Sequence, residues 1–156
     1  MQTNEKLTEV LNDLIEINND RVVGYEKAIA ETQAVDIDLR AVFSSMANDS
    51  RKHVTELTQE VNKLGGESAT GTTNLGKVYR VWMDVKKAFA TNDRQAILES
   101  CAFGEDAAQK AYTEALGSDA EISAEVRKII TDQQSSLMTA HNLIKKYRDA
   151  HEAVNA

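Results

Sequence analysis

A glutamate and a tyrosine stand seven residues apart in the stretch FGEDAAQKAY, at Glu105 and Tyr112. Seven residues make close to two turns of an α-helix, so both side chains lie on one face. The rest of that face is apolar and includes Leu98, Cys101 and Ala108. A carboxylate in such a stripe is costly to bury unless it has a partner, and a metal ion or a hydrogen-bond donor can fill that role.

Polar residues interrupt three further apolar stripes near their middles. These residues are Asn18 in the first, Ser50 and His53 in the second, and Gln134 and His141 in the last. Interruptions at similar depth on all four stripes predict a polar layer inside a helical bundle. The two halves also echo each other, because Asn18 precedes Tyr25 by seven residues, as Glu105 precedes Tyr112.

Two interpretations of this layer remain open. In one, His53, Glu105 and His141 hold a single Fe, Mn or Zn ion, since two imidazoles and a carboxylate suit these metals. In the other, the layer is held by hydrogen bonds alone. Glu105 then accepts a hydrogen bond from the hydroxyl of Tyr112 or Tyr25, and both histidines are neutral and hydrogen-bonded.

The positions of these residues depend on long helices. The chain of 156 residues contains no proline, and its glycines fall mostly between apolar-periodic segments. The 3.6-residue periodicity predicts helices over 4–32, 36–64, 93–117 and 123–152, with a short extra helix over 75–90. Short connections within each pair and a long one between the pairs predict one all-α domain over 1–156. The predicted fold is a four-helix bundle of two antiparallel hairpins joined by a crossover, an arrangement of the ferritin-like kind, with an irregular five-helix bundle as the alternative.

Composition excludes several classes of partner. The net charge is −7 with both signs interspersed, which argues against nucleic acid and anionic membranes. No apolar run approaches the ~20 residues of a membrane span. The N-terminal MQTNEKLTEV lacks the apolar region of a signal peptide, and the single cysteine fits a reducing compartment. A cytoplasmic protein is therefore expected.

Three features outside the stripes carry further expectations. Gly24 and Gly104 lie inside predicted helices, where each costs ~1 kcal/mol relative to alanine. They indicate either close helix approach near the polar layer or simple tolerance. Trp82, in the crossover, is expected to clamp that segment to the bundle, with a partner surface as the alternative.

Several motifs together carry a family resemblance: NNDRVVGYEKA, RKHVTEL, VNKLGG, VYRVWMDVKKA and GEDAAQKAY. Over nearly its whole length the chain resembles a small bacterial ferritin-like four-helix-bundle family of unknown function. In the ferritin-like superfamily, the first and third helices each supply a glutamate, often followed seven residues on by a tyrosine. The second and fourth supply Glu-x-x-His, and the set binds two iron or manganese ions.

By this resemblance most of the metal pattern is missing. Glu105, Tyr112, His53 and His141 match it, but the other three glutamates are replaced by Asn18, Ser50 and Met138. A di-iron centre is therefore not expected. Residues expected to surround the remaining ligands are Tyr25, Tyr112, Asn18, Ser50 and Gln134.

Two functions are weighed. The first is a non-enzymatic bundle that acts by associating with itself, as a homodimer, or with a protein partner, in a stress-associated role implied by the resemblance. The alternative is a mononuclear metal-binding protein that uses His53, Glu105 and His141.

Overall fold

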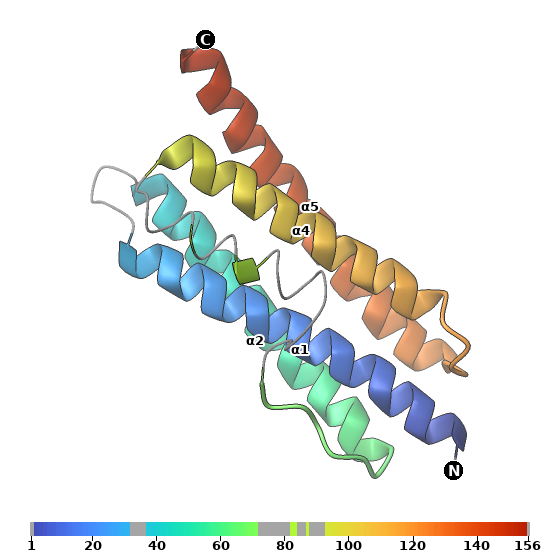
Figure 1. Ribbon diagram of the computed structural model, residues 1–156. Coiled ribbons are helices and arrows are strands. Elements are labelled where there is room, and N and C mark those ends of the chain that lie inside the picture. The colour runs from blue at the N-terminus through green and yellow to red at the C-terminus, as the bar shows by residue number, and fades with distance from the viewer. Residues whose placement is uncertain (1, 32–36, 72–81, 84–86, 88–92, 156) are drawn as a thin grey trace.

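The computed structural model describes residues 2–31, 37–71, 82–83, 87 and 93–155. Within them lie four helices: α1 (Gln2–Glu31), α2 (Ile37–Lys63), α4 (Arg94–Leu116) and α5 (Ala124–Asn155) (Figure 1). The prediction of an all-α four-helix bundle is confirmed, and the predicted helix ends lie within three residues of those observed. The expected extra helix over 75–90 lies outside the described residues except at 82, 83 and 87, which are helical.

The helices form two hairpins that lie against each other. α1 packs on α2 and α4 packs on α5, while α1 also contacts α4 and α2 also contacts α5. Figure 1 shows α2 and α4 running in the same direction, opposite to α1 and α5. Ion pairs tie the hairpins together near both ends, with Arg94 Nη2 3.0 Å from Asp38 Oδ2 and Lys6 Nζ 2.6 Å from Asp119 Oδ2.

α2 ends where the backbone takes a conformation that favours glycine. Gly65 has φ +76°, and the Gly66 N–H donates back to the Val61 carbonyl at 3.1 Å. Such a left-handed residue after the last turn satisfies carbonyls that the helix leaves free. The next helix pair begins with side-chain caps: Asp93 accepts from the Gln95 N–H at 3.0 Å, and Ser123 Oγ accepts from the Val126 N–H at 3.2 Å.

The connection that leaves α2 turns back along α1 at once. Asn12 Nδ2 donates to the Glu67 carbonyl at 2.9 Å, and its Oδ1 accepts the Ala69 N–H at 2.8 Å. Two turns further along α1, Asn19 Nδ2 donates to the Gly71 carbonyl at 2.9 Å. α1 therefore holds the start of the crossover against its side.

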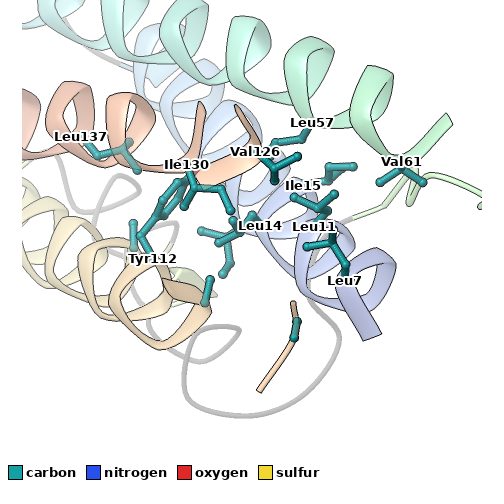
Figure 2. Close-up of a cluster of buried hydrophobic side chains, with 14 residues drawn as sticks. Leu7, Leu11, Leu14, Ile15, Leu57, Val61, Tyr112, Val126, Ile130 and Leu137 are labelled. Carbon is teal, nitrogen blue, oxygen red and sulfur yellow. The ribbon is translucent and has the colours of Figure 1, made fainter. Parts of the chain in front are cut away.

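The core consists of two apolar clusters with polar residues between them. One cluster lies where α2 and α4 begin and includes Tyr25, Phe43, Trp82, Leu98 and Ile144. The other lies where α1 and α5 begin, and Figure 2 shows Leu7, Leu11, Leu14, Leu57 and Ile130 converging there. The buried polar side chains at intermediate positions are Asn18, Asp20, Arg21, Ser50, His53, Glu105, Gln133 and His141.

No helix in the described part of the chain combines the length and the apolar character needed to cross a bilayer.

Candidate functional site

The centre of the polar layer is an ion pair between two fully buried side chains. Arg21 on α1 donates from Nε and Nη2 to Oε1 of Glu105 on α4, at 3.1 and 2.8 Å. Burial lowers the pKa of the Arg21 guanidinium, but Glu105 and the neighbouring tyrosines outweigh this effect and leave the pKa raised. Arg21 is therefore a fixed positive charge inside the bundle, and the Glu105 carboxylate is its counter-ion.

Tyr25 completes the shell around the same oxygen. Its hydroxyl donates to Glu105 Oε1 at 2.5 Å, and its ring lies 5.5 Å from the Arg21 guanidinium carbon. Burial, together with Glu105, raises the pKa of Tyr25 well above its usual value, so the phenol keeps its proton and remains a donor. The other carboxylate oxygen, Oε2, is buried and has no hydrogen-bond partner among the described residues.

From Arg21 the hydrogen bonds continue across α2 and back to α1. Arg21 Nη1 donates to Ser50 Oγ, and Ser50 Oγ donates to Asn18 Oδ1 at 2.9 Å. Asn18 Nδ2 in turn donates to the Tyr112 hydroxyl at 2.8 Å and to the Leu14 carbonyl at 2.8 Å. Ser50 and Asn18, which stand where the resemblance expects glutamates, thus serve as neutral links.

Gln133, rather than the predicted Gln134, supplies the polar position of α5. The Tyr112 hydroxyl donates to Gln133 Oε1 at 2.7 Å, and Gln133 is buried. Gln134 lies one residue further round the helix, where its Nε2 donates to Thr113 Oγ1 at 3.0 Å. This series of hydrogen bonds ends at the surface, where Gln133 Nε2 lies 3.4 Å from Oε1 of the exposed Glu56.

His53 faces the same layer and is held neutral. Its Nδ1 lies 3.2 Å from Asn18 Oδ1, an acceptor, so the proton of the neutral ring is on Nδ1. Burial, with Arg21 and Lys52 adding repulsion, lowers the pKa of His53 to about 4. The imidazole is therefore uncharged at neutral pH.

This lowered pKa predicts how stability depends on pH. Between the unfolded pKa of about 6.5 and the folded pKa of about 4, the unfolded chain binds the proton and the folded one does not. The contribution of His53 to the free energy of unfolding is complete above the unfolded pKa and is lost as the pH falls towards the folded pKa. It amounts to about 3 kcal/mol between pH 8 and pH 4. Urea unfolding as a function of pH measures it.

His53→Gln is the control, since it keeps a polar side chain that does not titrate. The pH dependence between 6.5 and 4 should be smaller in this variant by the His53 contribution. An unchanged pH dependence would show that His53 protonates as easily in the folded protein as in the unfolded chain.

His141 belongs to a separate contact at the edge of the layer. Its Nε2 meets the carboxylate of Asp106, which is about half exposed, while Nδ1 has no partner among the described residues. Met138, three residues earlier, is partly exposed and lies outside the layer.

The three residues predicted to share a metal therefore have different partners. Glu105 is bonded to Arg21 and Tyr25, His53 to Asn18, and His141 to Asp106. The described part of the chain contains no group of three His, Cys, Asp or Glu side chains placed to hold a metal ion.

Trp82 covers the layer from the crossover side. The indole is buried and meets Tyr25 edge-on, with 5.8 Å between ring centroids. A Cβ added at Gly24 would lie 3.0 Å from Cε3 of this ring, and one at Gly104 would lie 3.0 Å from Cζ2. Both glycines therefore leave room for the indole.

Cys101 sits beside this layer as an apolar filler. It is fully buried, and burial together with Glu105 raises the pKa of its thiol well above the usual value. Because the thiolate is the reactive and metal-binding form, the thiol is chemically quiet.

Arg21 is the residue of the polar layer that the sequence pattern did not reveal. The signal was present, since Arg21 is three residues after Asn18 and four before Tyr25, and those spacings put all three on one helical face. A charged residue in an amphipathic helix is usually solvent-exposed, so the pattern alone favoured the wrong environment.

Comparison with known proteins gives a family but no activity. A search of curated proteins found no match to the chain. The model of a family described as a domain of unknown function (DUF2383) matches residues 6–118, which include most of α1, all of α2 and α4, and the Arg21–Glu105 pair. This match spans more than half of the chain, and the protein belongs to that family.

Proposed function

We propose that this protein is a non-enzymatic helical bundle that acts through association, and that its polar layer is structural. The observation that carries the proposal is the buried guanidinium of Arg21, which neutralises Glu105 from within the chain. In the ferritin-like proteins that the chain resembles, metal ions supply positive charge at this depth. Here an arginine supplies it, and a cation added beside Oε1 would meet like charge.

The remaining polar groups support the same conclusion. Asn18, Ser50, Tyr112 and Gln133 satisfy one another in a continuous set of hydrogen bonds. Buried polar groups held in this way rigidify a core and fix one arrangement of its helices. With the interior so engaged, the surface is the part of the molecule left to interact.

The alternative, a mononuclear Fe, Mn or Zn site, draws on two observations. His53 is neutral, as a ligand must be, and Glu105 Oε2 has no described partner. To share one ion with them, His141 would have to leave Asp106. A cytoplasmic location, expected from the single cysteine and the N-terminal sequence, stays a prediction, and so does the stress-associated role that the resemblance implies.

Metal analysis separates the two proposals. Protein purified without a histidine tag is expected to carry far less than one equivalent of metal by elemental analysis. Calorimetric titration with Fe(II), Mn(II) or Zn(II) should show no stoichiometric binding, because Arg21 already compensates Glu105.

The ligand variants make this test specific. Near-stoichiometric metal that is lost in His53→Ala, His141→Ala and Glu105→Ala would establish the mononuclear site and overturn the structural assignment. Metal that survives all three substitutions would lie elsewhere on the chain and leave the assignment of the polar layer intact.

A further inference from the structure

The outer side of the α4–α5 hairpin carries a hollow with a phenylalanine at its edge. The hollow is lined by Glu99, Ala102, Phe103 and Asp106 from α4 and by Arg148 from α5. Phe103 is 67% exposed, although full burial of a phenylalanine is worth about 1.5–3 kcal/mol. Aromatic side chains are enriched at protein–protein interfaces, where they fill pockets on the partner, so an exposed phenylalanine beside a hollow suits such an interface.

The charges around Phe103 are divided between the two helices. Glu99 lies four residues before Phe103 and Asp106 three residues after it, so the α4 side is acidic. The α5 side of the hollow has Arg148, which donates to the adjacent Asp149 at 3.1 Å. No ion pair joins Glu99 to Arg148 within the described chain, although both line the same hollow.

The antiparallel packing of α4 and α5 places Glu99 and Arg148 at the same level along the helix axes. Asp106 is bonded to His141, and Glu99, two turns earlier on α4, shares the hollow with Arg148, two turns later on α5. A twofold axis parallel to the helices places α4 of one copy against α5 of another without changing height. Glu99 then faces Arg148 of the second copy, and the same pair forms again by symmetry.

We propose that this face binds a second copy of the chain, with Phe103 near the centre and two Glu99–Arg148 pairs at the rim. This inference rests on the proposed function and names the partner through which the bundle associates. The available area is sufficient. The length of α4, 23 residues, is ~35 Å, and two adjacent helices are ~20 Å wide, which gives ~700 Å² per copy. A stable interface of standard size buries about 600–1,000 Å² per partner.

Sedimentation or light scattering of the whole protein tests the surface. The wild type is expected to be a dimer, and Phe103→Asp a monomer at the same concentration, because the substitution buries two charges at the centre of the interface. Val23→Asp is the matched control, since Val23 is also partly exposed but lies on α1. It should remain dimeric. Circular dichroism of each variant checks that the helices are intact.

A mixing experiment tests the twofold pairing itself. Glu99→Arg alone and Arg148→Glu alone each set like charges against each other in a homodimer, so both variants should be weakened dimers. Mixed in equal amounts, they should form a heterodimer. One chain then carries arginine at both positions and the other carries glutamate at both, so each of the two contacts joins opposite charges. A contact within one chain could not be restored by mixing.

The outcomes separate this inference from the proposed function. A wild type that is monomeric at all accessible concentrations, or a dimer that survives Phe103→Asp, overturns the α4–α5 interface. Neither result bears on the polar layer, which metal analysis tests. Loss of dimerisation in both Phe103→Asp and Val23→Asp would also overturn the assignment of this face.

Discussion

Replacing Arg21 with methionine is expected to destabilise the protein by about 3–5 kcal/mol. The substitution keeps most of the buried volume but leaves the Glu105 carboxylate without its counter-charge in the interior. Breaking one side of a buried ion pair has this cost because the remaining charge is desolvated and unpaired. It is a large fraction of the 5–15 kcal/mol by which a domain is typically stable. Urea unfolding monitored by circular dichroism measures the loss.

Two further variants show whether charge is the cause. Arg21→Met with Glu105→Gln removes both charges and keeps an acceptor for Tyr25, so it should recover most of the loss. Arg51→Met removes an arginine of the same hairpin whose ion pair with Glu26 is about half exposed. It should change stability by less than about 0.5 kcal/mol. An Arg21→Met variant that is as stable as Arg51→Met would contradict the assignment of the Arg21–Glu105 ion pair as a major stabilising contact.

Truncating Trp82 to alanine is expected to cost about 3–5 kcal/mol, the usual penalty for removing a buried tryptophan side chain. The indole fills the space over Gly24, Gly104 and Tyr25, so its removal leaves a cavity there. Trp82→Phe should cost much less. It retains an aromatic ring, and Nε1 has no hydrogen-bond partner to lose among the described residues. Thermal unfolding of the two variants against wild type gives the difference.

The same contact predicts that Gly104→Ala destabilises the wild-type protein but stabilises the Trp82→Ala variant. Gly104→Ala brings a methyl group to 3.0 Å from one edge of the indole, and a Cβ built at Gly24 would likewise lie 3.0 Å from another edge. The indole is buried and packed between Gly24 and Gly104, so we expect that it cannot shift far enough to relieve the contact and that the variant is destabilised. In the Trp82→Ala background the clash is absent, and alanine should stabilise the helix by up to ~1 kcal/mol over glycine. Destabilisation in both backgrounds would mean that another neighbour limits Gly104.

Sequence patterns were sufficient to predict the four helices and the burial of most residues of the polar layer. The face on which a side chain lies is a local property of helical spacing, so Asn18, Ser50, His53 and Glu105 were correctly expected to be buried. The same spacing, with the connection lengths, predicted the two hairpins and the direction of each helix.

The partner of each polar group could not be predicted in the same way. It depends on how far each helix is rotated and shifted against its neighbours, and one residue along a helix is a rotation of about 100°. That difference separates Gln133, which is buried, from Gln134, which is not, and it lets His141 meet Asp106 instead of Glu105. No local pattern contains this information.

The placement of opposite charges on the two hairpins also decides how the halves of the chain recognise each other. Arg21 comes from the α1–α2 half and Glu105 from the α4–α5 half, although the halves share a similar pattern and each exposes an apolar face when alone. Two α1–α2 halves packed together would bury two guanidinium groups side by side, and two α4–α5 halves would bury two carboxylates. Only the unlike pairing neutralises the interior. The ion pair therefore makes the pairing of unlike hairpins more stable than the pairing of two like hairpins.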